Sequence, residues 1–239
     1  MPTPLELSET ITWMADGEDA FAAAAAGLDD AAVTGPSRLP GWTRGHVLSH
    51  LARNADALGN LLDWGRTGVE HRMYPDRVAR NADIDGGAGR DAATQRADLD
   101  SSRKRLATAV ADFPAERWTY LVRGATGREL PVADVPWLRT REVWLHLVDL
   151  DAGADLSVLP TGAAERLCAE NLRGFADRHD APAAQVVLLP GGTETVLGSG
   201  DGPTVLGAAS ALVGWLTGRD PGDLRTTDGA APPTLPSWL

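Results

Sequence analysis

Residues 140–150, TREVWLHLVDL, place polar side chains inside a segment of bulky apolar residues. Glu142, His146 and Asp149 are separated by four and then three positions, so on a helix all three lie along one stripe. The residues between them are mainly Val, Leu and Trp, which suit a buried helix face. A carboxylate, an imidazole and a second carboxylate on such a helix indicate either a solvated edge or a functional site.

Four long helices are predicted in the first two-thirds of the chain, where apolar residues recur at helical spacing. The predicted helices cover roughly residues 4–28, 43–68, 91–112 and 133–151. Thr43 and Asp91 are suitable N-caps for the second and third helices, and Pro136 fits only the first turn of the fourth. Four such helices, joined by connections of varied length, predict a four-helix bundle.

Two of the connections have recognisable patterns. Residues 71–90, HRMYPDRVARNADIDGGAGR, are polar and end in a glycine-rich stretch, which predicts a long loop of functional interest. Residues 118–132, WTYLVRGATGRELPV, predict two short extended segments joined by a glycine-containing turn.

The pattern changes after Gly153. A helix near 161–177 is followed by β-branched runs that alternate with Gly and Asp turns, and a last helix is expected near 207–218. The overall fold class is therefore α+β, with a helical bundle over residues 1–153 and a small α+β domain over residues 154–239. We expect Trp238 to pack the Pro-rich tail against that domain.

Composition limits the possible partners. The formal charge of −11 opposes non-specific binding to a phosphate backbone, so no nucleic-acid partner is expected. No apolar run approaches the roughly 18 residues that a membrane helix needs, and the acidic N-terminus lacks the features of a signal peptide. We expect a cytoplasmic protein without a membrane partner, and a monomer by default.

A single cysteine, Cys168, excludes an internal disulfide framework and a Cys-rich metal site. It is a possible nucleophile, but no His or Asn lies near it in sequence. Apolar neighbours at helical spacing favour a packed thiol.

Two of the predicted bundle helices carry a pair of potential metal ligands with a spacing of four residues. One pair is His46 and His50, and the other is Glu142 and His146. Facing helices can direct such side chains into a bundle core, and two His with one Glu would leave a fourth zinc position open. The alternative is that each pair is an exposed or capping pair without a ligand. His46 can also serve in packing or support, and Asp149 can orient an imidazole or cap the bundle edge.

Four segments together resemble the mycothiol-dependent maleylpyruvate isomerases. They are GWTRGHVLSHLARNADAL (41–58), MYPDRVARN (73–81), LRTREVWLHLVDL (138–150) and PSWL (236–239). The resemblance covers the whole chain and implies a DinB-like helical bundle followed by a small α+β domain. It also implies a divalent metal, usually zinc, held by His50, Glu142 and His146, and a catalytic Arg that matches Arg219.

The implied reaction is the cis–trans isomerisation of maleylpyruvate to fumarylpyruvate in gentisate degradation. A thiolate adds to the double bond, the resulting single bond rotates, and elimination restores the double bond. The chain has no suitable cysteine, so the thiol must come from outside, and mycothiol supplies it in the resembling family. A metal would keep that thiol deprotonated.

The substrate is a dianion, so an acidic protein must attract it locally. Arg219, and with weaker support Arg80, can form charge-assisted bonds to its carboxylates. Arg219 can instead interact with the C-terminal end of a helix dipole. Arg44, at the start of the second helix, is expected to be structural, and Trp42 and Trp144 are expected in the core.

Two other functions fit the same sequence. A mycothiol S-transferase acting on another electrophile would keep the fold, the metal and the thiol. A non-catalytic binding module would keep only the bundle and would bind no metal.

Overall fold

The structure is a computed structural model that describes residues 3–236. The chain divides into two compact units, one ending at Ala154 and the other beginning at Asp155. Within the described residues, no helix is long and apolar enough to cross a membrane. Trp238, which was expected to pack the tail, lies outside the described residues.

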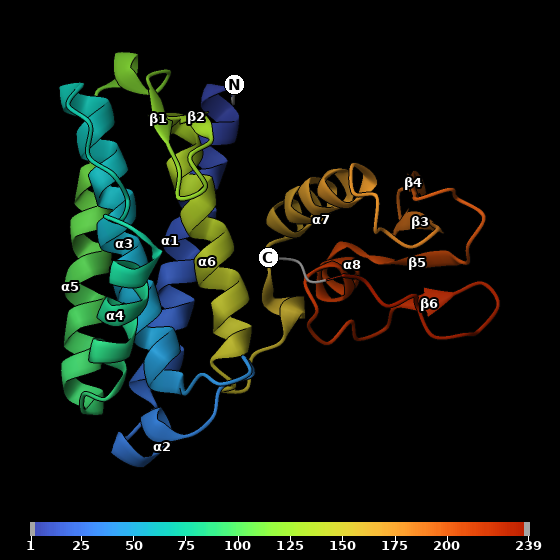
Figure 1. The fold of residues 1–239 in the computed structure, drawn as a ribbon, viewed down its shortest axis with the longest axis horizontal. Helices are drawn as coiled ribbons and strands as arrows, with labels where there is room; N and C mark the ends of the chain where they lie inside the picture. The colour runs from blue at the N-terminus through green and yellow to red at the C-terminus, as the bar shows by residue number, and fades with distance from the viewer. Residues whose placement is uncertain (1–2, 237–239) are drawn as a thin grey trace. The chain divides into compact units, whose positions relative to one another are not determined.

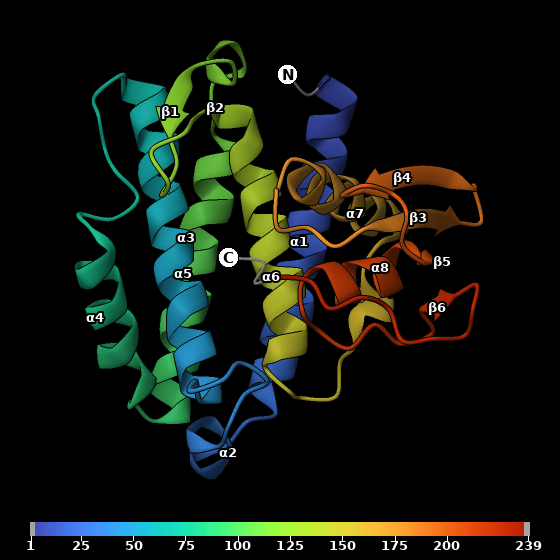
Figure 2. The ribbon, with the colours of Figure 1, turned by 45° about the vertical axis from the view of Figure 1, so that its right-hand side comes forward.

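Four long helices form the body of the first unit. They are α1 (Pro4–Ala26), α3 (Arg44–Thr67), α5 (Ala92–Ala111) and α6 (Val135–Asp149), with the short α2 (Asp30–Thr34) between α1 and α3. Two views show the four long helices running side by side (Figures 1 and 2). Thr43 and Asp91 cap α3 and α5, and Pro136 lies in the first turn of α6. The predicted helical bundle is therefore confirmed.

Apolar side chains fill the centre of this bundle. Leu58 and Leu61 of α3 have no exposed surface, and Leu106 and Val110 of α5 are also buried. Met14 of α1 belongs to the same cluster. These positions recur every three or four residues on each helix, so each helix buries one continuous stripe.

The segment at residues 71–90 is not the loop that the sequence predicted. Most of it is a fifth helix, α4 (Arg77–Ala88), which is capped by Asp76 and packs against α3. The glycines that suggested a loop permit this packing: a Cβ atom on Gly87 would collide with the side chain of Ser49. The prediction was wrong because close packing outweighs the cost of about 1 kcal/mol that a glycine imposes inside a helix.

Residues 118–132 contain the two short extended segments that were expected. β1 (Leu121–Arg123) and β2 (Glu129–Pro131) pair antiparallel. Gly127 in the turn has a positive φ of 80°, a conformation that glycine adopts without steric cost. The short 3₁₀ helices η1 (Ala115–Arg117) and η2 (Val132–Asp134) flank the hairpin, and α6 follows directly.

One buried ion pair connects three helices of the bundle. Arg139 of α6 has no exposed surface, and its Nε and Nη2 atoms lie 2.7 and 3.2 Å from the two carboxylate oxygens of Glu18 on α1. Its Nη1 atom donates to the backbone oxygen of Leu51 and to Oδ1 of Asn54 on α3, each at 2.8 Å. These bonds satisfy the buried guanidinium and fix α6 against α3 one turn away from Glu142.

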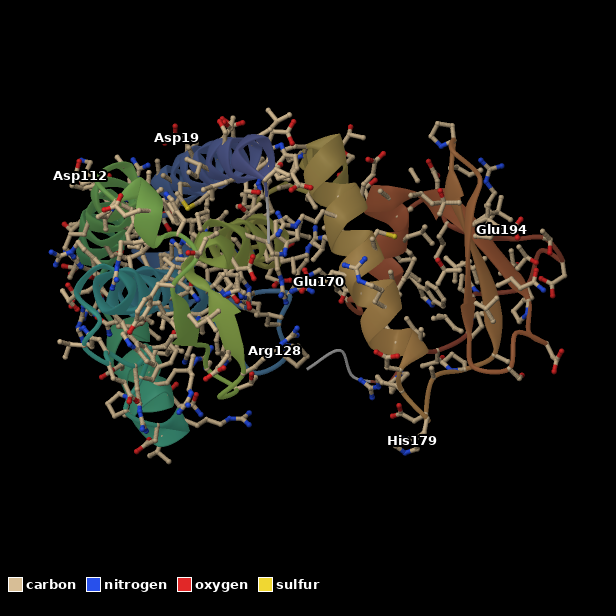
Figure 3. All side chains as sticks on the ribbon, turned by 90° about the horizontal axis from the view of Figure 1, so that it is seen from above. Asp19, Asp112, Arg128, Glu170, His179 and Glu194 are labelled. Carbon is tan, nitrogen blue, oxygen red and sulfur yellow. The ribbon has the colours of Figure 1, made fainter. Side chains whose placement is uncertain are left out.

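The second unit has the predicted α+β composition. A four-stranded sheet has the order β4 (Thr193–Leu197), β3 (Ala184–Leu189), β5 (Thr204–Ala208), β6 (Arg225–Thr226). β3 and β5 are parallel, and the other pairs are antiparallel. Two helices, α7 (Thr161–Ala176) and α8 (Ala209–Leu216), pack against each other, and η3 (Leu156–Val158) precedes α7. Figure 3 shows His179 and Glu194 at the periphery of this unit.

Candidate metal and active site

The three predicted metal ligands lie together inside the bundle. His50 comes from α3, and Glu142 and His146 come from adjacent turns of α6. One ligand atom from each of these residues lies within 4.8 Å of the others. Glu142 Oε2 is 2.9 Å from His50 Nε2 and 3.4 Å from His146 Nε2. The two imidazole rings meet edge to face, with centroids 4.7 Å apart.

These distances suit a small divalent cation. Zinc binds His nitrogen and carboxylate oxygen at about 2.0–2.2 Å, so neighbouring ligand atoms of a tetrahedral site are roughly 3.4 Å apart. The Glu142–His146 separation already has that value, and the Glu142–His50 separation is shorter because these groups hydrogen-bond to each other. The residues therefore fit a metal with small side-chain shifts, and three ligands leave a position for a further one.

Burial and hydrogen bonding shift the pKa values of the two histidines in opposite directions. Burial lowers the pKa of His50 from 6.5 to about 4, and the hydrogen bond with Glu142 offsets this only in part. Burial acts in the same direction on His146, but hydrogen bonds with Asp149 and Glu142 raise its pKa above 6.5. Hydrogen bonds with both histidines also hold the pKa of Glu142 well below its usual value, although burial opposes them. Glu142 is therefore a carboxylate at neutral pH.

Asp149 orients His146 rather than capping the bundle edge. Its side chain is 1% exposed, and its Oδ2 atom lies 2.8 Å from His146 Nδ1. A carboxylate at Nδ1 places a proton on that nitrogen and directs Nε2 toward Glu142. Of the two roles that the sequence left open for Asp149, the structure favours the first.

His46 lies outside the three-residue cluster. Its Nδ1 atom accepts a hydrogen bond from the backbone nitrogen of Thr43 at 3.1 Å, which completes a capping box at the start of α3. Its Nε2 atom is 3.8 Å from a carboxylate oxygen of Asp85 on α4. His46 therefore stabilises the helix end that carries His50.

The prediction that Trp42 belongs to the core was wrong. Its indole is partly exposed and lies against two histidines, with ring centroids 6.0 Å from His46 and 5.6 Å from His50. Trp42 precedes the N-cap of α3, so the helical spacing of the two histidines gave no signal for this contact. Trp144, in contrast, is buried as expected, and its Nε1 atom donates to the backbone of Trp13.

Tyr74 and Arg80 form a second contact that was not predicted from the sequence. Tyr74, which the sequence did not single out, lies under the guanidinium of Arg80, 5.8 Å from the ring centroid, and hydrogen-bonds with it. Burial raises the pKa of Tyr74, and nearby Glu142 adds to the effect. Arg80 Nη2 lies 3.2 Å from His50 Nδ1. Both residues therefore border the three-residue cluster.

Three further candidates, Arg44, Cys168 and Arg219, have contacts within their own units. Arg44 binds the backbone oxygens of Leu150 and Asp151, so its expected structural role is confirmed. Cys168 of α7 is buried, and burial raises the pKa of its thiol to about 12. It is the packed thiol that was expected. Arg219 belongs to the second unit, where it follows α8 and donates to the backbone oxygen of Thr217.

The helical bundle and the cluster of His50, Glu142 and His146 together define a DinB-like helical-bundle protein. YfiT from Bacillus subtilis, described as a probable metal-dependent hydrolase with an unusual four-helix bundle topology, has this architecture with a TM-score of 0.54. It is 14% identical to the chain and the match covers 63% of this chain and 87% of that one, so it supports the fold alone. More particularly, the chain belongs to the mycothiol maleylpyruvate isomerase family, whose N-terminal domain matches residues 14–151.

Solved structures of that family extend over the entire chain. The crystal structure of the mycothiol-dependent maleylpyruvate isomerase is 30% identical, with a TM-score of 0.92, and the match covers 100% of this chain and 98% of that one. A mutant of that enzyme, with one histidine replaced by alanine, matches with the same values. Comparison with curated protein sequences gives no match.

Proposed function

We propose that the protein is a metal- and mycothiol-dependent isomerase that converts maleylpyruvate to fumarylpyruvate. The observation that carries this proposal is the His50–Glu142–His146 cluster, whose ligand atoms lie within 4.8 Å of one another in a bundle of the isomerase family. The likeness to the crystal structure of the isomerase along the full chain supports the same activity. We place the reaction in gentisate degradation.

The chemistry requires an external thiol. A thiolate sulfur bonds to one alkene carbon, and the alkene electron pair moves to the conjugated ketone oxygen. Rotation about the new single bond follows, after which the electron pair restores the double bond and the carbon–sulfur bond breaks. The thiolate is regenerated, so no other reactant is consumed. Cys168 cannot supply it, because the thiol is buried and its pKa is raised to about 12.

His50, Glu142 and His146 would hold the metal in this proposal, and Asp149 supports one of them. A divalent cation, with zinc as the expected ion, would supply a Lewis acid that keeps the thiol of mycothiol deprotonated. Glu142 contributes the negative charge, since its pKa is well below the usual value. Asp149 directs Nε2 of His146 into the site. A His₂Glu site also accepts other divalent ions, and measured metal content would identify the native one.

Two arginines are proposed for the substrate carboxylates. Arg80 borders His50 directly. For Arg219, which we propose as the catalytic arginine of the second unit, the support is the sequence resemblance to the family, which implies an arginine at the end of the last helix. We further propose that residues 1–153 form a bundle domain with the metal site and that residues 154–239 form a small α+β domain that carries Arg219.

Product analysis tests the reaction. Metal-loaded protein is incubated with maleylpyruvate, with and without mycothiol, and the vinyl protons are followed by ¹H NMR because cis and trans isomers differ in coupling constant. We expect conversion to the trans isomer only when mycothiol is present. A stable mycothiol adduct without isomerised product would indicate an S-transferase instead, and a protein that binds no metal would indicate a binding module. Arg219→Ala should retain the metal and lose turnover.

A further inference from the structure

The chain contains two tyrosines, and each lies against the guanidinium of an arginine. The ring centroid of Tyr120 is 4.5 Å from Arg117, and its hydroxyl donates to the backbone oxygen of Gly68 at 3.4 Å. The ring centroid of Tyr74 is 5.8 Å from Arg80, and its hydroxyl hydrogen-bonds with that guanidinium. A guanidinium only donates, so the oxygen of Tyr74 accepts this bond and its own proton can be donated elsewhere.

The segment that carries Tyr74 and Arg80 is fixed to the bundle on both sides of the pair. Before the pair, the side chain of Asn60 on α3 donates to the backbone oxygen of Arg72 at 3.1 Å. After it, Arg80 lies in the first turn of α4, and its Nη1 atom donates to Oδ1 of Asn81 at 3.1 Å. The two side chains are therefore held in place before a ligand arrives, which lowers the entropy cost of binding one.

The pair also borders the three-residue cluster. Nη2 of Arg80 lies 3.2 Å from Nδ1 of His50. Tyr74 lies close enough to Glu142 for its negative charge to act together with burial and raise the pKa of the phenol above 10. The phenol is therefore protonated at neutral pH. A positive charge and a neutral O–H donor thus lie side by side next to the cluster, and a carboxylate can accept hydrogen bonds from both.

We propose that Tyr74 is a substrate-binding residue whose hydroxyl donates to a carboxylate of the substrate, beside Arg80. The ligand class that this pair fits is a small dicarboxylate, with one carboxylate on Tyr74 and Arg80 and the reacting carbons toward the cluster. The inference rests on the proposed function and adds a contact to it. The competing role for Tyr74 is to position Arg80 through its ring alone.

Tyr74→Phe separates these two roles, because it keeps the ring against Arg80 and removes only the hydroxyl. A bond to a carboxylate that does not react is made equally in the bound substrate and in the transition state. We therefore expect KM for maleylpyruvate to rise about tenfold, with kcat changed less than about twofold.

Tyr120→Phe is the matched control, since it removes the hydroxyl of the other tyrosine that lies against an arginine. It should leave both KM and kcat within about twofold of the wild type. Unchanged KM in Tyr74→Phe, with an active wild type, would overturn the inference and leave the proposed function standing. A wild type that does not isomerise maleylpyruvate would overturn both.

Binding without turnover gives an independent measurement. In zinc-loaded protein labelled with ¹³C at Cζ of tyrosine, NMR gives one signal for each tyrosine, and Tyr120→Phe assigns them. Saturation with maleate, a small cis dicarboxylate, should shift the signal of Tyr74 and leave that of Tyr120 in place, because the Cζ shift responds to hydrogen bonding of the phenol. Calorimetry should find maleate bound about tenfold more weakly by Tyr74→Phe.

The metal content of each protein is measured alongside and should be the same in Tyr74→Phe, Tyr120→Phe and the wild type, because neither tyrosine belongs to the cluster. Maleate affinity that is equal in Tyr74→Phe and the wild type would contradict the inference. So would a Tyr74 signal that does not move when maleate saturates the protein.

Discussion

Asp149 is fully buried, and its carboxylate lies 2.8 Å from Nδ1 of His146, on the side of the ring away from Glu142. Asp149→Asn keeps the shape of the side chain but removes the charge that holds a proton on Nδ1. We expect metal affinity to fall by about 10–100-fold, the usual effect of losing such a supporting carboxylate. Competition with a chromophoric chelator measures the affinity. Asp112→Asn, at the exposed end of α5, is the control, and unchanged affinity in Asp149→Asn would contradict the role of Asp149.

Metal affinity should also depend on pH in a defined direction. Hydrogen bonds with Asp149 and Glu142 raise the pKa of His146 above 6.5, so the metal-free ring retains a proton at pH values where an ordinary histidine has lost it. A cation must displace that proton, so apparent affinity should rise by up to about tenfold per pH unit until the raised pKa is passed, and then level off. Chelator competition between pH 5.5 and 8.5 (roughly the range in which a histidine titrates) measures this. Affinity that is constant across the range would show that His146 is not a ligand.

The thiol of Cys168 should be unreactive in the folded protein. Burial raises the pKa of its thiol to about 12, so at neutral pH almost none of it is thiolate. We expect Ellman's reagent to react with this thiol only after unfolding, and we expect Cys168→Ala to retain mycothiol-dependent turnover. Rapid reaction of the native protein, or loss of turnover in a folded Cys168→Ala protein, would assign the cysteine a part in the chemistry.

The buried pair of Arg139 and Glu18 should dominate the electrostatic stability of the bundle. Arg139→Met leaves the Glu18 carboxylate buried without its partner, so the free energy of unfolding should fall by about 3–5 kcal/mol in urea denaturation. Arg103→Met, which breaks an exposed pair with Asp19, should cost less than about 1 kcal/mol. A double variant with Glu18→Gln and Arg139→Met should recover part of the loss. Similar small costs for Arg139→Met and Arg103→Met would contradict this interpretation.

The sequence predicted the bundle because its signals are local. Apolar spacing marked the helices, while Thr43, Asp91 and Pro136 marked where three of them begin. The same local reasoning failed for α4, where Gly87 looked like a loop residue. Its real function is close contact with Ser49 of α3, which depends on two helices distant in sequence and is therefore not visible in either one alone.

The candidate site was predictable to a similar extent. The spacing of four residues in α3 and in α6 identified the pairs that contain His50, Glu142 and His146. It did not show that Trp42 would stack on His46 or that Tyr74 would contact Arg80, because Trp42 and Tyr74 lie outside the helices. The choice of His50 rather than His46 came from the family resemblance, and in the structure His46 is bound in a helix cap.

The metal content of purified protein tests the site most directly. Inductively coupled plasma mass spectrometry of the wild type, Glu142→Ala and the control Glu129→Ala, an exposed carboxylate of the hairpin, gives the number of divalent ions per chain. We expect about one ion per chain in the wild type and in Glu129→Ala, and almost none in Glu142→Ala, as a three-ligand site requires. A folded Glu142→Ala protein that retains a full complement of metal, or a wild type that binds none after incubation with zinc, would contradict the assignment of His50, Glu142 and His146 as a metal centre.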